Sequence, residues 1–256
     1  MSTLATPLAD SSIMLRRNLK HTLRNPTTVF NAVLFPIVIM LMFVKVFGGA
    51  FSVGDAYIDY ATPGLLVMAV SYGLGATATA VNDDMTKGII NRFKTMDVSR
   101  GSVLTGHVVV TTVRCLVAEA ALIGVAFAMG FDPSASAADW LGAIGLLVLL
   151  SFGAGWLTVA LGLAAKSVET AGLGTVPLIM LPFLSSAFVP ADTMGAGVRQ
   201  FAEYQPFTPV IETLRAALAG TDAGYAPLVA AAWCAAIALA GYLWSRHRFT
   251  NPPRPR

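Results

Sequence analysis

Glu119 is the ionisable residue that lies deepest in an apolar part of this chain, within the run from about 108 to 130. An unpaired carboxylate at the centre of a bilayer costs on the order of 2.5–3.5 kcal/mol even on the most lenient insertion scale. Glu119 must therefore face a partner, a cavity or another subunit. A proton relay is one possible use, but relays involve several acids, so we favour a structural role or a place along a translocation pathway. Arg114, five positions earlier, points away from Glu119 and is expected to extend to the membrane interface.

Side chains that carry enzymatic chemistry do not occur here in the spacing that such chemistry requires. The three histidines, His21, His107 and His247, are isolated, so no His-x-x-x-His pair is present to hold zinc. A nucleotide-binding P-loop ends in Gly-Lys-Ser/Thr, and the chain has no Gly-Lys dipeptide. Cys115 and Cys234 fall inside apolar runs, where cysteine packs as a small apolar residue. We expect a chain that is not an enzyme and holds no metal or cofactor itself.

Six long apolar runs make up most of the sequence. Each is about as long as the ~20 helical residues that cross ~30 Å of hydrocarbon. The composition agrees, since 55% of the residues are hydrophobic, 12% are charged and the mean hydropathy is +0.68. The sequence therefore predicts an all-α polytopic membrane protein with six transmembrane helices. The runs cover residues 27–47, 61–81, 108–130, 140–165, 171–189 and 226–245.

The basic residues indicate how these spans are oriented, because Lys and Arg in short loops are retained on the cytoplasmic side. With six spans, 13 of the 17 basic residues fall on one side, and many of the acids fall on the other. We therefore expect both termini in the cytoplasm. The net charge of +3 is then a topology signal, and nucleic-acid binding is not expected. The 13 residues are Arg16, Arg17, Lys20, Arg24, Lys87, Arg92, Lys94, Arg100, Lys166, Arg246, Arg248, Arg254 and Arg256.

An amphipathic helix is predicted ahead of the first span, within residues 1–26. Leu15 and Leu19 recur at helical spacing, with Arg16 and Lys20 among the basic residues between them. Such a helix lies in the cytoplasmic membrane interface. The alternative is a basic anchor that has no further role.

The segment between the second and third spans, residues 82–100, is too long for a simple turn. Two acids stand at its start, where the helix dipole favours them, and Met85, Ile89 and Phe93 then fall on one helical face. A short cytoplasmic helix with this apolar stripe beside Arg92 is suited to dock into a groove of a partner protein. The alternative is a helix that lies on lipid headgroups.

A second long segment, residues 190–225, lies on the outer side between the fifth and sixth spans. Prolines and glycines divide it into two short helices near 196–204 and 209–219. In the second of these, Glu212 and Arg215 are three residues apart and are expected to pair at its surface. The segment either caps a pathway in the outer interface or forms an inert cover.

Glycine and proline in the fourth and fifth spans predict close packing and bending. Gly142, Gly145 and Gly153 would let the backbone of a neighbouring helix approach, while Gly174 and Pro177 can break the fifth span. Two interpretations fit these residues: ordinary close packing of the helices, and helices that move against each other.

Several stretches of the sequence together resemble a known family of transporters, the permease subunits of type-2 ATP-binding-cassette exporters. The closest resemblance is to the daunorubicin/doxorubicin-resistance permease family of actinobacteria. It covers nearly the whole chain, and the loop at 82–100 is its most specific part. The stretches are the basic N-terminal helix, YATPGLLVM at 60–68, NDDMTKGIINRFKTMDVSR at 82–100, MGFD at 129–132, SSAFVP at 185–190 and QPFTP at 205–209.

This resemblance implies two permease subunits of six spans each, side by side, with two separate ATPase subunits that bind ATP and Mg. In that family the interface helix and the loop helix after the second span contact the ATPase. Carried over by position, the residues that face the ATPase are Met85, Ile89, Arg92 and Phe93. Asp97 stands where the family often has proline, which affects the end of this coupling helix.

We therefore expect the permease subunit of an ATP-driven exporter in the cell membrane, which moves an amphipathic or hydrophobic molecule outward. Its expected partners are the ATPase, a second permease copy or a sister permease, and membrane lipids. A proton-coupled secondary carrier that uses Glu119 is the alternative, and a membrane scaffold is a weaker third. The expected parts of the chain are the interface helix at 1–26, the transmembrane domain at 27–245 and a basic cytoplasmic tail at 246–256.

Overall fold

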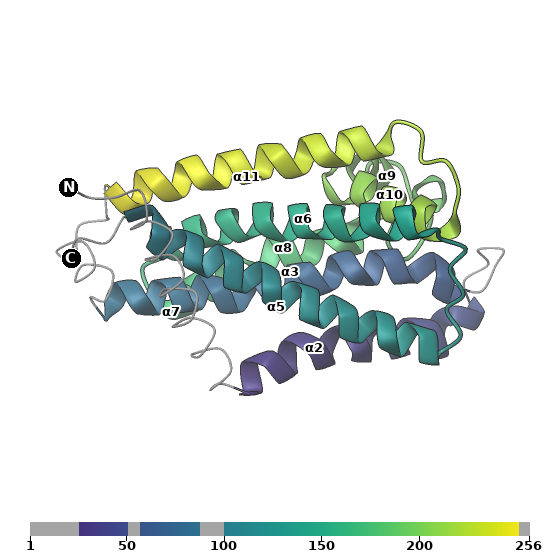
Figure 1. Cartoon of the computed structure of the whole chain (residues 1–256), viewed down its shortest axis with the longest axis horizontal. Coiled ribbons are helices and arrows are strands. Elements are labelled where there is room, and N and C mark those ends of the chain that lie inside the picture. Colours follow the sequence, from purple (N-terminus) through teal and green to yellow (C-terminus); the bar gives the residue numbers. More distant parts are fainter. Residues whose placement is uncertain (1–25, 51–56, 88–99, 251–256) are drawn as a thin grey trace.

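The computed structural model describes residues 26–50, 57–87 and 100–250 (Figure 1). Every regular element in these ranges is a helix. The all-α, multi-pass class predicted from the sequence is therefore confirmed. The predicted interface helix and most of the predicted coupling helix lie outside the described residues.

Five of the described helical segments are long and apolar enough to cross a membrane. They overlap the predicted first, second, third, fourth and sixth spans. A helix suits this environment because it satisfies its backbone hydrogen bonds internally, as hydrocarbon requires. The segments are α2 (Pro26–Leu41) with its continuation through η1 (Met42–Phe47) and η2 (Gly48–Ala50), α3 (Tyr57–Thr86), α5 (Arg100–Ala128), α6 (Ala137–Ala164) and α11 (Ala226–Thr250).

The predicted fifth span, 171–189, is a chain of short helices instead of one continuous helix. Thr175 separates the first two pieces, and its hydroxyl donates a hydrogen bond of 2.7 Å to the Gly172 carbonyl. Pro177 follows in the first turn of the second piece, where its missing N–H costs nothing. The break expected from Gly174 and Pro177 is therefore present. The pieces are α7 (Val168–Gly174), α8 (Val176–Met180) and η3 (Leu181–Leu184).

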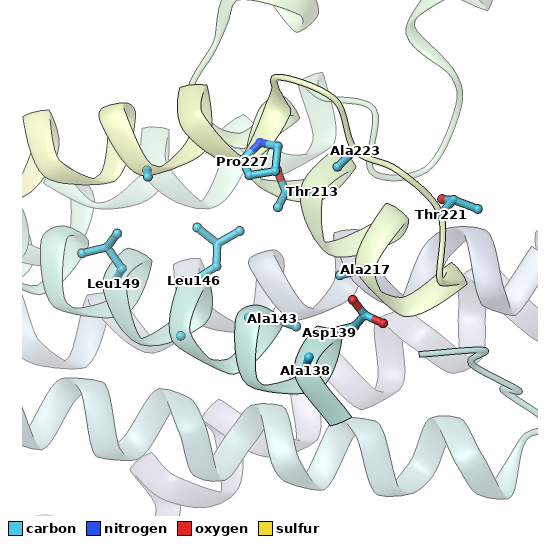
Figure 2. A pocket seen from close by; sticks show the side chains of 13 residues that line it. Ala138, Asp139, Ala143, Leu146, Leu149, Thr213, Ala217, Thr221, Ala223 and Pro227 are labelled. Atoms are coloured by element: carbon cyan, nitrogen blue, oxygen red, sulfur yellow. The ribbon is translucent and has the colours of Figure 1, made fainter. Parts of the chain in front are cut away.

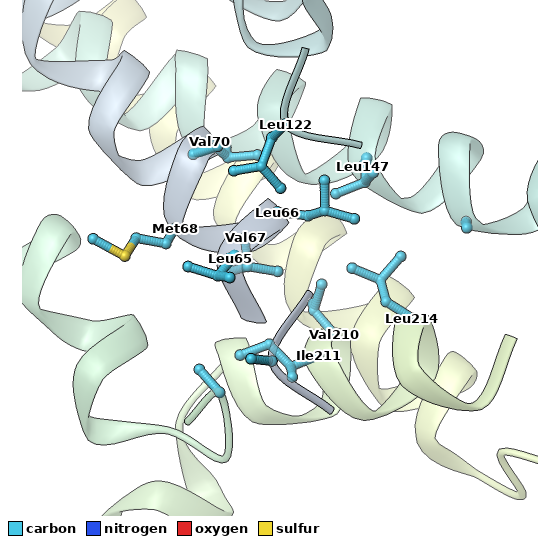
Figure 3. Close-up of a cluster of buried hydrophobic side chains, with 14 of the residues drawn as sticks. Leu65, Leu66, Val67, Met68, Val70, Leu122, Leu147, Val210, Ile211 and Leu214 are labelled. Carbon is cyan, nitrogen blue, oxygen red and sulfur yellow. The ribbon is translucent and has the colours of Figure 1, made fainter. Parts of the chain in front are cut away.

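Helix α3 lies at the centre of the bundle. It contacts α2, α5, α6, α7, α8 and α10, and 72% of its most apolar window is buried, against 17% for α11. Figure 3 shows how α3 side chains meet those of three neighbouring helices. This cluster includes Leu65, Leu66, Val67, Met68 and Val70 of α3, Leu122 of α5, Leu147 of α6, and Val210, Ile211 and Leu214 of α10.

Helix α11 packs on α6 through two glycines. A Cβ atom at Gly153 would lie 2.9 Å from the Cys234 carbonyl oxygen of α11. At Gly241 a Cβ would lie 2.7 Å from the Trp156 carbonyl carbon and would collide with the Leu157 nitrogen. One turn later, the Ser245 hydroxyl donates to the Trp156 carbonyl at 3.0 Å. The two backbones therefore approach each other directly, as small residues permit in membrane helices.

The two short helices predicted near 196–204 and 209–219 are present as α9 (Val198–Tyr204) and α10 (Phe207–Ala219), and a short 3-10 helix, η4 (Ala191–Thr193), precedes them. Helix α10 buries an apolar face against the core through Ile211 and Leu214, which explains its amphipathic sequence. It ends at Gly220, whose left-handed backbone (φ +64°) lets its N–H bond to the last carbonyls of the helix.

Basic and acidic residues are distributed unequally along the bundle, although both kinds occur at each end. Helices α3, α6 and α11 end, and α5 begins, at one end of the molecule (Figure 1). We call this the basic end, because Lys87, Lys166, Arg246 and Arg248 lie there. The acidic end is opposite, beside α9 and α10, and carries Asp59, Asp132, Asp139, Asp192 and Asp222.

Candidate functional site

Asn82 fastens the last turns of α3 to the end of α6. Its side-chain amide donates to the carbonyl oxygens of Gly162 (3.1 Å) and Ala165 (2.9 Å). These carbonyls belong to the C-terminus of α6, where the last backbone acceptors have no partner within the helix. Gly162 allows this approach, since a Cβ there would lie 2.6 Å from the Ala78 carbonyl oxygen. Asn82 therefore connects the C-terminal part of α3 to the C-terminus of α6. Helix α7 begins shortly after α6 in the sequence, so its start lies near the same contact.

Replacing Asn82 with leucine should lower stability while preserving side-chain volume. The variant leaves two α6 carbonyls without their donor, which costs about 1–3 kcal/mol for a buried group. We expect the melting temperature of the purified protein to fall by roughly 2–10 °C. Thr86→Val is the matched control, because the Thr86 hydroxyl bonds only to the Asp83 carbonyl on an exposed part of the same helix. An equal melting temperature for Asn82→Leu and wild type would contradict this role.

A set of polar contacts joins α3 to α5 from the basic end inward. Asp84 Oδ2 lies 3.3 Å from His107 Nε2, with both side chains nearly buried. One to two turns deeper, the Thr77 and Thr111 hydroxyls are 2.6 Å apart. Arg114 Nη2 completes the set by donating to the Thr77 hydroxyl at 2.7 Å. We call these five side chains the polar seam; it connects the two helices that flank residues 88–99.

The expectation that Arg114 extends to the membrane interface is wrong. Besides the Thr77 hydroxyl, its guanidinium donates to the Gly73 carbonyl of α3 at 2.6 Å. Both bonds come from Nη2, so one nitrogen of the guanidinium has two acceptors inside the bundle. Arg114 is thus part of the α3–α5 contact.

Glu119 lies one turn beyond Cys115, on the buried face of α5. Its side chain is 2% exposed, and neither carboxyl oxygen has a hydrogen-bond partner among the described residues. The Cys115 thiol faces the Val70 carbonyl of α3 at 3.8 Å. Glu119 is therefore enclosed by the bundle and does not pair with Arg114, as its position five residues away predicted. An ionised carboxylate without a partner would be strongly unfavourable in this place.

Met85 is the one candidate for ATPase contact that falls within the described residues. It is half-buried and packs against a small apolar cluster that includes Val81, Leu104 and Phe249. The cluster unites the ends of α3, α5, α6 and α11 at the basic end. The other candidates lie outside the described residues: Ile89, Arg92 and Phe93 of the loop, and Leu15, Arg16, Leu19 and Lys20 of the interface helix.

At the acidic end, Arg215 does not form the expected pair with Glu212. Its guanidinium lies over the Tyr60 ring, 3.9 Å from the ring centroid, and donates to the carbonyl oxygens of Ser186 (2.7 Å) and Tyr60 (3.3 Å). The ring face and the two carbonyl oxygens together stabilise the guanidinium more than a single exposed carboxylate would. This arrangement fixes α10 to the start of α3.

Three of the stretches that carry the family resemblance meet at this place. The Tyr60 hydroxyl donates to the Ser186 carbonyl at 3.0 Å, and the Thr208 hydroxyl accepts from the Ser186 N–H at 3.4 Å. Gly64 packs so closely on Ala187 that a Cβ would lie 2.6 Å from its methyl group. Residues 60–68, 185–190 and 205–209 therefore form one structural unit, although more than 100 positions separate the first from the others.

A comparison with known protein families gives one match, the ABC-2 type transporter, over residues 11–219. The chain belongs to the ABC-2 type transporter family. Among curated proteins, this ABC-2 chain is 29% identical to the daunorubicin resistance ABC transporter permease protein DrrB1 of Streptomyces coeruleorubidus, over 77% of the chain and 70% of that protein. It is 24% identical to the probable doxorubicin resistance ABC transporter permease protein DrrC of Mycobacterium tuberculosis, over 81% of the chain and 76% of that protein. The resemblance to the permease subunits of type-2 ATP-binding-cassette exporters is therefore confirmed.

Membership of the ABC-2 family has a direct consequence for the chemistry. Such a chain is a membrane permease subunit of an exporter, and the ATPase activity of these transporters lies in a separate subunit. Sequence reasoning did not select Thr77, Thr111 or Asn82, and it did not predict the contacts that Asp84, His107 and Arg114 make across the polar seam. Asn82 was visible as the first residue of the most specific stretch, but only the α6 carbonyls beside it explain its presence.

Proposed function

We propose that this chain is the permease subunit of an ATP-driven exporter that moves an amphipathic or hydrophobic molecule outward across the cell membrane. The observation that carries the proposal is the ABC-2 match over residues 11–219, together with relatives named as drug-resistance permeases. ATP and Mg would bind to the partner ATPase. A second copy of this chain, or a sister permease, would complete the transmembrane part.

Six crossings of the membrane, with both termini in the cytoplasm, fit the fold best. Helix α6 ends at the basic end, and α11 begins at the acidic end (Figure 1). The chain between them must cover the length of the bundle, and α7, α8 and η3 supply the apolar residues for that crossing. Because basic residues are retained in the cytoplasm, the basic end is the cytoplasmic end.

The proposed coupling begins in the loop helix, with Met85, Ile89, Arg92 and Phe93 facing the ATPase. The interface helix provides a second contact through Leu15, Arg16, Leu19 and Lys20. A displacement of the loop would act on α3 and α5 together, because Asp84 contacts His107. It would also reach the α6–α7 junction through the hydrogen bonds of Asn82. This continuity of packed and bonded helices supports the proposal.

Glu119 remains a candidate for the translocation pathway within this proposal. Its unpartnered, buried carboxyl is the observation that would favour a proton-coupled carrier. The family assigns the energy source to a separate ATPase, so that alternative is not favoured.

Transport assays in proteoliposomes test the proposal. We expect no transport by the isolated chain, and transport once an ATPase subunit and ATP are added. Glu119→Gln keeps the side-chain shape without the titratable group, so ATP-driven transport should stay within about threefold of wild type, as expected for a residue outside the energy-coupling step. Transport by the isolated chain under an imposed proton gradient, lost in Glu119→Gln, would overturn the proposal.

A further inference from the structure

A groove of about 410 Å³ opens between α6, α10 and the start of α11, near the acidic end (Figure 2). It exists because α6 and α11 touch at Gly153 and Gly241, toward the basic end, while α10 lies beside them at the acidic end. Its volume is within the range of roughly 300–1,000 Å³ typical of small-molecule sites. The groove is therefore large enough for part of a ligand.

The lining of the groove is mostly apolar, and its polar side chains are those of Thr213, Thr221 and Asp139. Leu146 and Leu149 of α6 form one wall, and Ala217 of α10 and Pro227 of α11 stand opposite (Figure 2). The only ionisable residue in the lining is Asp139, in the first turn of α6. This combination of a hydrocarbon-like cavity and a single carboxylate suits a ligand that is apolar along its length and positively charged at one end.

The carboxylate of Asp139 is held in place and has no cationic partner in the described part of the chain. Its Oδ2 accepts from the Ser136 N–H (2.9 Å) and hydroxyl (2.6 Å), which completes the cap of α6. Arg215, on the neighbouring helix α10, is occupied by Tyr60 and Ser186. The lining of the groove therefore carries one negative charge, that of Asp139, and no positive charge.

Two glycines of α6 face this open space. A Cβ atom at Gly142 or Gly145 would meet nothing within 4 Å, whereas one at Gly153 would meet the backbone of α11. Within this chain, neither of these two glycines lies in a helix–helix contact. They lie in the lining of the groove and widen it.

The groove lies between two membrane-spanning helices, so its occupant enters from the hydrocarbon. Leu141 and Leu228, on the two helices that bound it, are 72% and 70% exposed, as expected of side chains in contact with lipid. We propose that the groove binds an acyl chain of a membrane lipid that carries a primary amine, with the ammonium group at Asp139. A lipid with an anionic headgroup and no amine would bring its phosphate toward Asp139 without compensation. The proposal requires only that the chain lies in the membrane and does not depend on what it exports.

Native mass spectrometry of the full chain in detergent tests the site, with dioleoyl phosphatidylethanolamine and dioleoyl phosphatidylglycerol as the two probes. We expect wild type to bind the amine lipid at least about tenfold more tightly than the glycerol lipid. Gly142→Leu combined with Gly145→Leu projects two side chains into the groove from positions where an added Cβ meets nothing within 4 Å, and leucine favours the helix more than glycine. This double variant should bind the amine lipid at least about tenfold more weakly than wild type does, because the leucine side chains occupy space in which the acyl chain would be buried.

Asp139→Asn and Gly124→Leu complete the test. Asparagine can still accept from Ser136, so α6 keeps its cap, but the preference for the amine lipid should disappear. Gly124 of α5 is likewise open, with nothing within 4 Å of an added Cβ, and it does not line the groove. Gly124→Leu should therefore bind as wild type does. Equal binding of the two lipids by wild type would overturn the proposal, and so would unchanged binding by the groove-filling variant.

Discussion

Replacement of Gly241 with alanine should reduce the yield of folded protein to a small fraction of wild type. The added methyl group would stand 2.7 Å from the Trp156 carbonyl carbon and 2.8 Å from Leu157 Cα, and still nearer to the Leu157 nitrogen. All three are backbone atoms of α6, so no side-chain rotation can relieve the contact. Helix α11 would have to move away from α6, which would also stretch the hydrogen bond from Ser245 to Trp156. We expect a loss of about 3 kcal/mol or more, the upper part of the range for overpacking.

Fluorescence-detected size-exclusion chromatography of a tagged protein, followed by a thermal melt, measures this effect. Gly124→Ala is the matched control, because that glycine also lies in a membrane-spanning helix and nothing stands within 4 Å of its added Cβ. The control should elute and melt as wild type does. A Gly241→Ala protein with the same yield and melting temperature as the control would mean that α6 and α11 do not pack as described.

Replacement of Phe93 with aspartate should abolish ATP-driven transport while the chain still inserts into the membrane. Phe93 belongs to the apolar stripe predicted for the coupling helix, with Met85 and Ile89. A charge buried in an apolar groove of the ATPase would have no partner, and desolvation of such a group is expensive. Loss of an aromatic anchor at the centre of an interface typically costs about 2 kcal/mol or more, which corresponds to roughly 30-fold weaker binding.

Co-purification with the ATPase and transport in proteoliposomes measure the two parts of this expectation. Thr95→Asp is the control, since it places the same charge about 200° away around the same predicted helix. The control should retain both assembly and transport. If Phe93→Asp assembles and transports normally, then the loop helix lies on lipid headgroups, which is the alternative that the sequence left open.

The class of the protein and most of its local structure can be predicted from the sequence alone. Membrane insertion depends on the summed hydropathy of about 20 consecutive residues. The apolar runs can therefore be recognised as spans without knowing which other parts of the chain they contact. The break at Thr175 follows from Gly174 and Pro177, whose backbone preferences are also local. The buried face of α10 could be predicted in the same way, because Ile211 and Leu214 recur at helical spacing.

The same local reasoning located the charged residues but not their partners. Glu212 is three positions from Arg215, and this proximity suggested a surface pair. In the structure, Arg215 instead donates hydrogen bonds to the carbonyl oxygens of Tyr60 and Ser186, which are 155 and 29 positions away. Arg114 likewise bonds to the Gly73 carbonyl, 41 positions away. A half-buried cation bonds to the acceptors that the fold brings near it, and the distance along the sequence does not identify them.

The role of each glycine of α6 depends on how the helices pack, which the sequence does not show. Gly145 and Gly153 lie eight residues apart on one helix, and nothing in the sequence distinguishes them. Gly153 lies against the Cys234 carbonyl oxygen of α11, whereas Gly145 faces the groove. The difference arises because α6 and α11 converge toward the basic end and leave a space beside α10. The sequence shows which positions of α6 are glycine. Whether such a glycine contacts the backbone of another helix or lines an open groove depends on where α6 and α11 cross.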